Sequence, residues 1–377
     1  MRRLPLLFLF CLVGALAAVP AASAASLGFA ADEGFQAALP VNAGGAAAVP
    51  PVPTLDQALD TLNTKWVRID VRWNAIATAQ PTNARLPGNA AYTWSSVEAQ
   101  VLAARAIILA HQAPAAGPPA LLFSIGGTPD WARSDGGAGG TPGDPAWAPK
   151  RAAFQNFVAA VVAKYGTYAA AFEIWPNPNV QAGLRPQRLA GRLVAPGLLR
   201  VLTKYATTEI RKVTAAPIIT GGLARTDPAS TVDTPSIAFL RAMARTRIQA
   251  DAIGVRLVPA GGVETPADAG NLALSDPNTI VANVDAYFPN QGKGIWATGY
   301  GVPSTADPAS QPAGVTAFLT AAANPRFGVA IWNNLIDTAA APGAGLFSAI
   351  APLDATTQKP AWSTWTTLVP LPVTPPV

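Results

Sequence analysis

Short apolar runs rich in β-branched residues alternate with longer amphipathic stretches along most of this chain, and about eight such units can be counted. A strand followed by a helix, repeated in this way, is typical of a parallel sheet covered by helices, and eight repeats suit closure into a barrel. Half of the 377 residues are hydrophobic and only 12% are charged, which is sufficient for one large core. We therefore predict an α/β fold, a single-domain (β/α)8 TIM barrel that spans residues 25–368.

The predicted strands are short and β-branched, and most are bounded by Gly, Pro or polar residues. They cover residues 27–29, 66–72, 120–125, 171–175, 217–222, 251–255, 294–298 and 327–332. The predicted helices lie near residues 55–63, 96–112, 151–165, 197–213, 236–248, 278–288, 313–323 and 361–367. A Gly- and Pro-rich stretch, residues 126–149, follows the third strand, so in a barrel it lies over the mouth at the C-terminal ends of the strands.

Both ends of the sequence differ in composition from the predicted barrel. Two arginines follow Met1, an apolar run covers residues 4–19, and Ala22-Ser23-Ala24 provides an A-x-A site. This order is typical of a secretory signal peptide, and the apolar run is short for a membrane span. We predict cleavage after Ala24, a secreted or extracytoplasmic protein, and no integral membrane segment in the mature chain. Residues 369–377 contain four prolines and form a predicted extended tail.

Charge and composition exclude several classes of function. Removal of Arg2 and Arg3 leaves 24 basic and 21 acidic residues, and the basic residues form no long run. This pattern predicts solvated helix faces and no nucleic-acid surface. The only cysteine, Cys11, lies in the signal peptide, and the only histidine, His111, falls near the end of a predicted helix. Without clustered His, Cys or carboxylate residues we expect no metal site and no cofactor.

The second predicted strand alternates apolar and charged residues. Period 2 places the apolar residues on the face toward the helices, and Arg68, Asp70 and Arg72 on the face inside the barrel. Inward charges are costly unless they pair. Asp70 and Glu173 are the available partners for the arginines, which predicts an ion network inside the barrel. A binding role for Arg72, the nearest of these residues to the mouth, is the second interpretation.

Two motifs carry a resemblance to a known family. Residues 172–179 read FEIWPNPN and residues 295–301 read IWATGYG. They resemble the catalytic motifs E-I-W-N-E-P-N and I-W-x-T-E-x-G of retaining (β/α)8 glycoside hydrolases, closest to family 39 and more loosely to family 5. Other matching segments occur in the same order, at residues 65–70, 127–132, 154–166, 172–175, 252–255, 331–335, 345–347 and 359–362.

The resemblance implies two catalytic carboxyl groups, and both are missing. The family's acid/base, after the fourth strand, corresponds to Asn177, and its nucleophile, on the seventh, corresponds to Gly299. Retaining and inverting hydrolysis both need two carboxyl groups, and an amide is not titratable in the useful range. The family's sugar-binding Asn before the acid/base is Pro176 here, and Arg256-Leu257-Val258 replaces the His-x-Tyr motif of many relatives.

Three other residues are candidates for relocated catalysts. Tyr300 follows the vacant nucleophile position, and tyrosine nucleophiles are known in sialidases. Asp130 follows the third strand, and Glu173 lies in the fourth. For each of them a structural role is the favoured interpretation: aromatic packing for Tyr300, a loop or cap for Asp130, and a buried ion pair for Glu173.

Aromatic residues are what remains of the expected sugar site. Four tryptophans fall at or near predicted strand ends, and the resemblance aligns Trp332 with the family's sugar platform. Aromatic faces stack on the C–H faces of sugars, although for each of the other tryptophans core packing is an equally good interpretation. The predicted carbohydrate-binding residues are Trp332, Trp175, Asn177, Asn179, Arg72, Trp131, Trp296 and Tyr300.

The leading hypothesis is a secreted, catalytically inactive glycoside-hydrolase-like barrel that binds a poly- or oligosaccharide. One alternative is an active O-glycosyl hydrolase with relocated catalytic residues, namely Glu173, Asp130 or Tyr300. A further alternative is a scaffold or interaction protein that binds no sugar.

Overall fold

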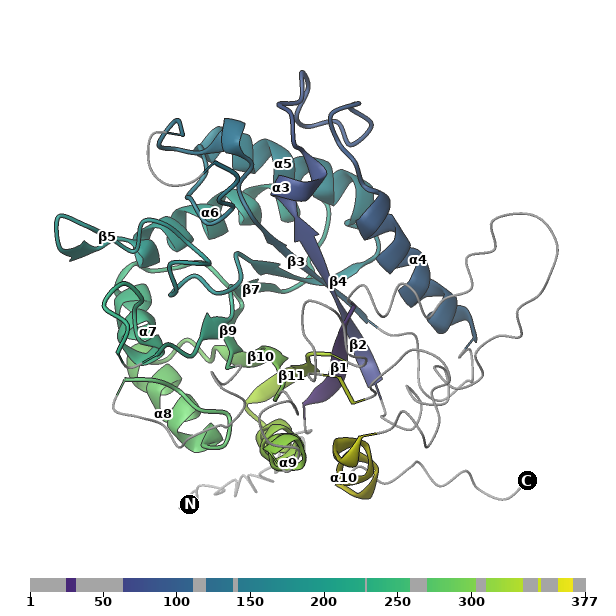
Figure 1. Ribbon diagram of the computed structural model, residues 1–377, viewed down its shortest axis with the longest axis vertical. Coiled ribbons are helices and arrows are strands. Elements are labelled where there is room, and N and C mark those ends of the chain that lie inside the picture. The colour runs from purple at the N-terminus through teal and green to yellow at the C-terminus, as the bar shows by residue number, and fades with distance from the viewer. Residues whose placement is uncertain are drawn as a thin grey trace, which may run out of the picture.

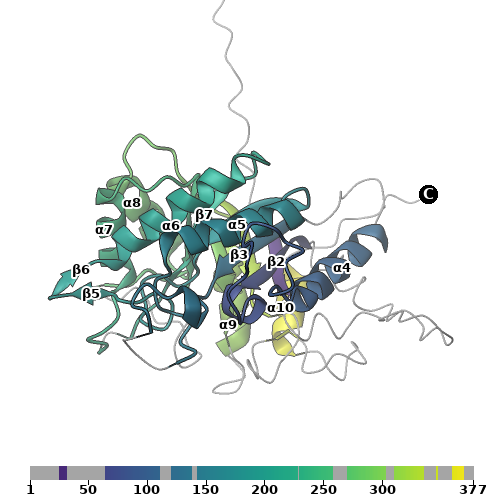
Figure 2. The ribbon, with the colours of Figure 1, turned by 90° about the horizontal axis from the view of Figure 1, so that it is seen from above.

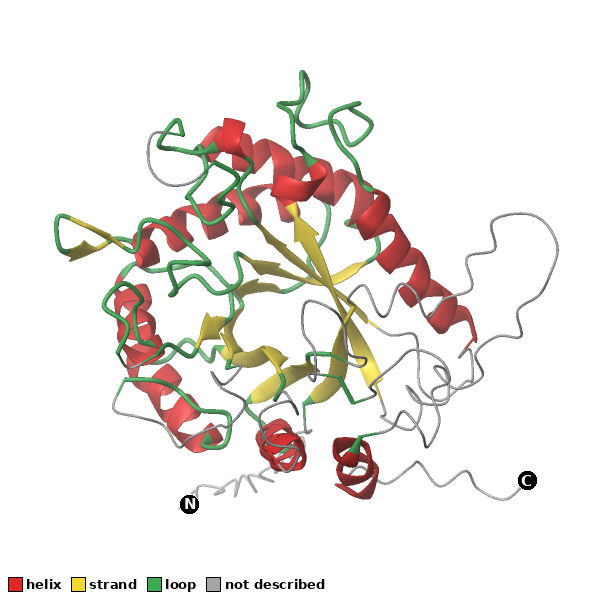
Figure 3. Ribbon diagram, in the orientation of Figure 1, coloured by secondary structure: helices red, strands yellow, loops and turns green. Residues whose placement is uncertain are grey.

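The computed structural model describes residues 25–31, 64–110, 120–137, 142–227, 229–257, 270–302, 310–334, 345–346 and 359–368. Parallel strands form a closed barrel at its centre, and helices surround that barrel (Figures 1 and 3). The eight barrel strands are β1 (Ser26–Ala31), β2 (Thr64–Arg72), β3 (Ala120–Gly126), β4 (Ala169–Ile174), β7 (Ile218–Thr220), β9 (Ala252–Arg256), β10 (Gly294–Tyr300) and β11 (Phe327–Trp332). The predicted TIM barrel is confirmed.

The barrel closes between its first and last strands. Residues 26–29 of β1 pair in parallel with residues 329–332 of β11, and the other side of β1 pairs with β2. The remaining neighbours follow chain order from β2 to β3, β4, β7, β9, β10 and β11. Because all these strands are parallel, their C-terminal ends meet at one rim, where such barrels carry their binding sites.

The helices agree with the predicted rhythm. They are α3 (Trp73–Ile76), α4 (Ser95–Ala110), α5 (Arg151–Tyr165), α6 (Ala195–Ile210), α7 (Ser236–Arg245), α8 (Pro277–Tyr287), α9 (Ser310–Ala322) and α10 (Pro360–Leu368), with a 3-10 turn η1 at Asp130–Ala132. The predicted helix near residues 55–63, the signal peptide and the C-terminal tail lie outside the described residues. Within the described part of the chain, no helix is both long and apolar enough to cross a membrane.

One short strand and one short hairpin lie outside the eight-stranded barrel. The strand β8 (Leu223–Ala224) adds to β9 in parallel. The strands β5 (Arg188–Leu189) and β6 (Arg192–Leu193) form an antiparallel hairpin in the long connection after β4. In Figure 2 this hairpin projects from the edge of the molecule.

The core has an outer and an inner layer. Apolar residues on the outer face of the strands pack against the helices, as Val67, Ile69 and Val71 of β2 do. A smaller apolar cluster fills the barrel interior and includes Leu122 and Trp296. Because side chains alternate between faces along a strand, the residues two positions after each of these inner ones also point inward. After Leu122 and Trp296 these positions are Ser124 and Thr298, so the interior becomes polar toward the mouth.

A charged cluster outside the barrel ties α5 and α6 to the loop after α3. Glu209 is buried, and its carboxylate accepts hydrogen bonds from Arg85 at 2.6 Å, Gln155 at 2.6 Å and Lys212 at 2.9 Å. Burial alone raises the pKa of Glu209, but these hydrogen bonds and the charge of Arg85 outweigh it and lower the pKa to about 2.

Candidate functional site at the barrel mouth

Glu173 is the centre of the polar layer inside the barrel. Its Oε2 accepts hydrogen bonds from the Ser124 hydroxyl at 2.6 Å and from Arg68 Nε at 3.1 Å. Its Oε1 accepts from the Thr298 hydroxyl at 2.7 Å and from the backbone N–H of Gly222 at 2.8 Å. The side chain has no exposed surface. The buried ion pair that the sequence predicted for Glu173 is therefore confirmed, and four protein donors occupy its carboxylate.

The charged residues of β2 extend this network toward the mouth. Arg68 is buried, and its Nη2 lies 2.8 Å from Asp70 Oδ1. Arg72 Nη2 lies 3.9 Å from Asp70 Oδ2, and the Arg72 side chain is 76% exposed. Burial raises the pKa of Asp70, but the charges of Arg68, Arg256 and Arg72 outweigh it, so the pKa lies below its ordinary value. Arg72 is thus the solvent-facing end of a buried ion network.

The position expected for the nucleophile is filled by an arginine. A Cβ atom added to Gly299 would lie 3.0 Å from both Cγ and Nε of Arg256, and 3.2 Å from Oδ1 of Asn333. A Cβ added to Gly222 would lie 2.9 Å from the Arg256 Cβ. Two residues without side chains therefore leave the space along which Arg256 extends from the end of β9 toward β10. At the position where the sequence resemblance predicts a carboxylate, this barrel has a guanidinium.

Arg256 stands among like charges. Burial, followed by the charges of Arg68 and Arg72, lowers the pKa of Arg256, while the charges of Asp70 and Glu173 raise it. The net result is a pKa of about 10. The guanidinium is protonated at neutral pH. Within the described part of the chain it has neither a hydrogen bond nor an ion pair closer than 4.0 Å.

The loop after β4 places Asn177 at the rim in an unusual backbone conformation. Trp175 and Asn177 have φ angles of 65° and 56°, a left-handed region that non-glycine residues rarely adopt. Gly221 permits this path, because a Cβ there would overlap the carbonyl oxygen of Trp175. The Asn177 N–H donates to the carbonyl of Gly222 at 3.0 Å, and its side-chain Oδ1 is buried without a hydrogen-bond partner. Asn177, which the sequence resemblance aligns with an acid/base, thus carries an unsatisfied amide oxygen, and its backbone is hydrogen-bonded to Gly222.

Asn179 has a structural role in this structure. Its Nδ2 donates to the carbonyls of Ala224 at 2.8 Å and Thr234 at 2.9 Å, and its Oδ1 accepts from the Ala224 N–H at 2.7 Å. The side chain has no exposed surface. Asn179 therefore fastens the loop after β4 to the neighbouring loop and has no group left for a ligand.

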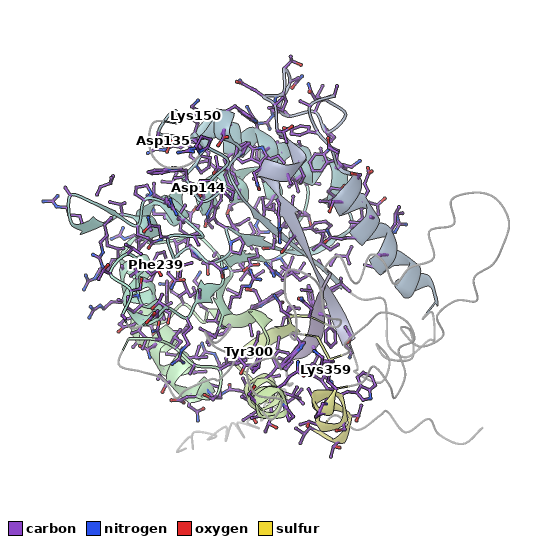
Figure 4. The ribbon with its side chains drawn as sticks, in the orientation of Figure 1. Asp135, Asp144, Lys150, Phe239, Tyr300 and Lys359 are labelled. Carbon is purple, nitrogen blue, oxygen red and sulfur yellow. The ribbon has the colours of Figure 1, made fainter. Side chains whose placement is uncertain are left out.

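The structure places Trp332 and Tyr300 away from the mouth, which corrects the expectation that they contact a sugar. Both are fully buried. The ring of Tyr300 stacks on Phe318 of α9 at 6.1 Å, and Trp332 packs edge-on against Phe318 at 5.5 Å and against Trp365 of α10 at 5.9 Å. Figure 4 shows Tyr300 beside α9. These side chains point outward into the layer between sheet and helices, where Tyr300 cannot attack a substrate.

The other tryptophans are only partly available. Trp175 is buried against Phe154 and donates to the Gly183 carbonyl at 2.8 Å, and Trp296 lies low in the barrel interior, 5.0 Å from Trp66. Neither presents a face at the mouth. Trp131 in η1 is partly exposed, and its Nε1 donates to the Ala77 carbonyl at 2.8 Å. Of the four predicted tryptophans, Trp131 alone retains solvent-accessible surface for stacking.

The carboxylates of the loop after β3 are held within that loop or by its neighbour. Asp130 accepts from the Gly143 N–H at 2.9 Å, Asp135 lies 2.8 Å from Arg133, and Asp144 lies 2.7 Å from Arg185. Figure 4 shows Asp135 and Asp144 well separated from Tyr300. These contacts give Asp130 the loop role that the sequence favoured, and they do not favour a relocated catalyst in this loop.

Sequence reasoning did not identify Arg256 and Asn333 as site residues. In the sequence, Arg256 is a departure from the His-x-Tyr motif of the glycoside hydrolases that the chain resembles, and nothing around it indicates that its side chain spans the gap to Gly299. Asn333 follows β11, and its buried Oδ1 lacks a hydrogen-bond partner. Among the described residues, no three His, Cys, Asp or Glu side chains gather as metal ligands.

Comparison with known proteins identifies the fold. The sequence matches no protein-family model and no curated protein. Among solved structures, the clostridial cellulose synthase subunit Z from Clostridioides difficile is similar, with 12% identity over 90% of this chain and 99% of the other, at a TM-score of 0.54. A broad-specificity endoglucanase from Clostridium acetobutylicum has 11% identity over 91% and 96%, at a TM-score of 0.53. An endoglucanase from Thermotoga maritima has 13% identity over 86% and 92%, at 0.52. At such low identity these similarities concern the fold alone, and they agree with the (β/α)8 TIM barrel described above.

Proposed function

We propose that this protein binds a carbohydrate at the mouth of its barrel and does not hydrolyse it. The observation that supports this most directly is the replacement at the nucleophile position, where Arg256 lies 3.0 Å from the point at which a side chain of residue 299 would begin. A guanidinium cannot attack an anomeric carbon, and the amide of Asn177 cannot supply the proton that the leaving oxygen needs.

The two carboxylates near the mouth do not replace the missing pair. Asp70 and Glu173 both contact the guanidinium of Arg68, which places them within about 8 Å of each other, a separation compatible with an inverting pair. However, both carboxylates are held by the same Arg68 guanidinium. Glu173 has no exposed surface with which to reach a glycosidic oxygen. The lowered pKa of Asp70 keeps that group ionised, so it is not a general acid.

Carbohydrate binding is the function that the scaffold and the remaining groups support. Similar solved structures include two endoglucanases, which act on glycans. At the rim of this barrel the Arg72 side chain is largely exposed, and Asn177, Asn333 and Trp131 are partly exposed residues. Hydroxyl-rich ligands need such a combination of hydrogen-bonding groups and aromatic surface. We further propose that the chain is secreted after removal of residues 1–24.

The test is hydrolysis and binding measured on the same preparation. Purified protein is incubated with aryl glycosides and with a panel of polysaccharides, and binding to the same panel is followed by calorimetry. We expect no product above the buffer control and saturable binding to at least one glycan. Product release that is abolished in Asp70→Asn but persists in Asp285→Asn, a surface variant, would establish a working hydrolase. Absence of any binding would favour a scaffold without a sugar site.

A further inference from the structure

Among the described residues, the mouth of the barrel carries one more positive charge than its carboxylates neutralise. Three arginines, Arg68, Arg72 and Arg256, face two carboxylates, Asp70 and Glu173. Both carboxylates contact Arg68, and Asp70 also lies 3.9 Å from Arg72. This assignment leaves Arg256 as the guanidinium without a partner in the described part of the chain.

Burial makes this arrangement costly. A half-buried cation beside two other cations loses hydration and gains repulsion, and the lowered pKa of Arg256 reflects both effects. Proteins usually avoid this cost by pairing such a group with a carboxylate. Here the adjacent strand offers Gly299 at the closest position, and within the described residues no carboxylate lies within 4.0 Å of Arg256, so the guanidinium is available to an anionic ligand.

Unsatisfied hydrogen-bond acceptors lie beside the unpaired cation. Asn333 Oδ1 is next to the same Gly299 position that Arg256 approaches, and it is buried without a partner. Asn177 Oδ1 is likewise buried without a partner, and the Asn177 backbone is hydrogen-bonded to Gly222, against which the Arg256 stem packs. Amide oxygens accept hydrogen bonds from hydroxyl groups, while a guanidinium binds carboxylates, sulfates or phosphates. Arg256, Gly299 and Asn333 come from the ends of β9, β10 and β11, which are neighbours in the barrel, and Asn177 comes from the loop after β4 (Figure 1).

We propose that the carbohydrate bound at this mouth is acidic, with its anionic group on Arg256 and its hydroxyl groups on Asn333 and Asn177. Arg72 supplies a second, solvent-facing positive charge for the approach of the ligand. The ligand's anion would then lie near residue 299, where the sequence resemblance predicts a carboxylate. The inference rests on the proposed carbohydrate-binding function and specifies the class of sugar.

The first experiment compares two monosaccharides that differ in the acidic group. Glucuronate and glucose, each at millimolar concentration and constant ionic strength, are titrated into the full protein, and binding is followed by thermal shift and calorimetry. We expect glucuronate to raise the melting temperature of the wild type and glucose to leave it unchanged. Equal responses to the two sugars, or no response to glucuronate, would overturn the proposal.

Variants assign the effect to the mouth. Arg256→Gln, which removes the charge, should weaken glucuronate binding at least tenfold, because charge-assisted hydrogen bonds are the strong ones. Arg326→Gln is the matched control, since Arg326 pairs with Asp285 outside the barrel mouth and its loss should leave the response unchanged. If Arg256→Gln does not fold, Arg72→Gln decides: this exposed residue tolerates substitution, and its loss should weaken glucuronate binding severalfold. A response unaffected by either change would refute the assignment.

A glycan array separates this inference from the proposed function. Binding confined to uronate-, sulfate- or phosphate-bearing glycans supports both. If neutral glycans bound and Arg256→Gln did not affect this binding, the proposed carbohydrate binding would be supported and the specificity for acidic sugars would be refuted. If glucuronate raised the melting temperature but no arrayed glycan bound, the anion site would be supported and the proposed binding of a polysaccharide would be refuted.

Discussion

Replacing Glu173 by glutamine tests whether the barrel interior depends on one buried carboxylate. The amide has nearly the same shape, so packing is preserved, but one of its ends carries an NH2 group. If nitrogen takes the Oε1 position, it faces the backbone N–H of Gly222 across 2.8 Å. If it takes the Oε2 position, it faces Arg68 Nε–H across 3.1 Å. Either orientation sets two donors against each other, and neither of these N–H groups can turn into an acceptor.

The magnitude follows from the charge that is left behind. Breaking a buried ion pair by removing one partner typically costs about 3–5 kcal/mol. Arg68 keeps its contact with Asp70 at 2.8 Å, so we expect a loss of about 3 kcal/mol, near the lower end of that range. The free energy of unfolding is measured by urea denaturation, where the midpoint should fall while the slope stays constant.

A surface variant calibrates the measurement. Glu98 lies 2.6 Å from Lys164, but the Glu98 side chain is 47% exposed. Glu98→Gln should therefore cost less than about 1 kcal/mol, as exposed pairs do. If Glu173→Gln also lost less than about 1 kcal/mol, the buried network would contribute little and the reasoning from its four donors would be refuted.

Three further changes probe other parts of the molecule. The pKa of Glu209 is lowered to about 2, because its hydrogen bonds outweigh its burial, so the stability that the ionised group contributes is present above about pH 4.5 and is lost as the pH falls. Urea unfolding of the wild type and of Glu209→Gln at pH 7 and pH 3 should show the difference in unfolding free energy shrinking by about 1–2 kcal/mol at the lower pH. A difference that stays constant would contradict this. Trp332→Ala should lower the free energy of unfolding by about 3–5 kcal/mol, whereas Trp332→Phe should fold and keep glycan binding. If a folded Trp332→Phe variant lost glycan binding, the interpretation of Trp332 as a sugar contact would be correct after all. The double change Asn177→Glu with Gly299→Glu should not produce glycosidase activity, because the new side chain begins 3.0 Å from Arg256; release of product from aryl glycosides would disprove this.

The strands and the charged layer could be predicted from the sequence, because both depend on local periodicity. The alternation in residues 67–72 gives the two faces of β2 directly, and the structure places Val67 outside and Arg68 inside as expected. Pairing of Arg68 with Glu173 followed from the cost of an unpaired buried charge. Such inferences need only the strand period and the sign of the charges.

The orientation of side chains at the strand ends could not be predicted in the same way. A shift of one residue moves a side chain to the other face of a sheet, and the pairing of β10 with β11 shifts register between Ala297 and Tyr300. Tyr300 therefore packs outward beside α9 although Thr298, two positions earlier, points inward, and Trp332 packs outward there as well. The contact of Arg256 with the Gly299 position likewise depends on the reach of a long side chain between neighbouring strands.

The closure of the barrel has a consequence for how the chain acquires its structure. Residues 26–29 of β1 pair with residues 329–332 of β11, so one edge of β1 stays unpaired until almost all of the described chain is present. Contacts of such sequence separation are slow to form, because a long loop must close first. The ring pair Phe29–Trp365, at 5.3 Å, adds the last helix to the same late step. A nascent or truncated chain that stops before β11 is left with two open sheet edges, at β1 and β10, and is expected to aggregate instead of folding in part.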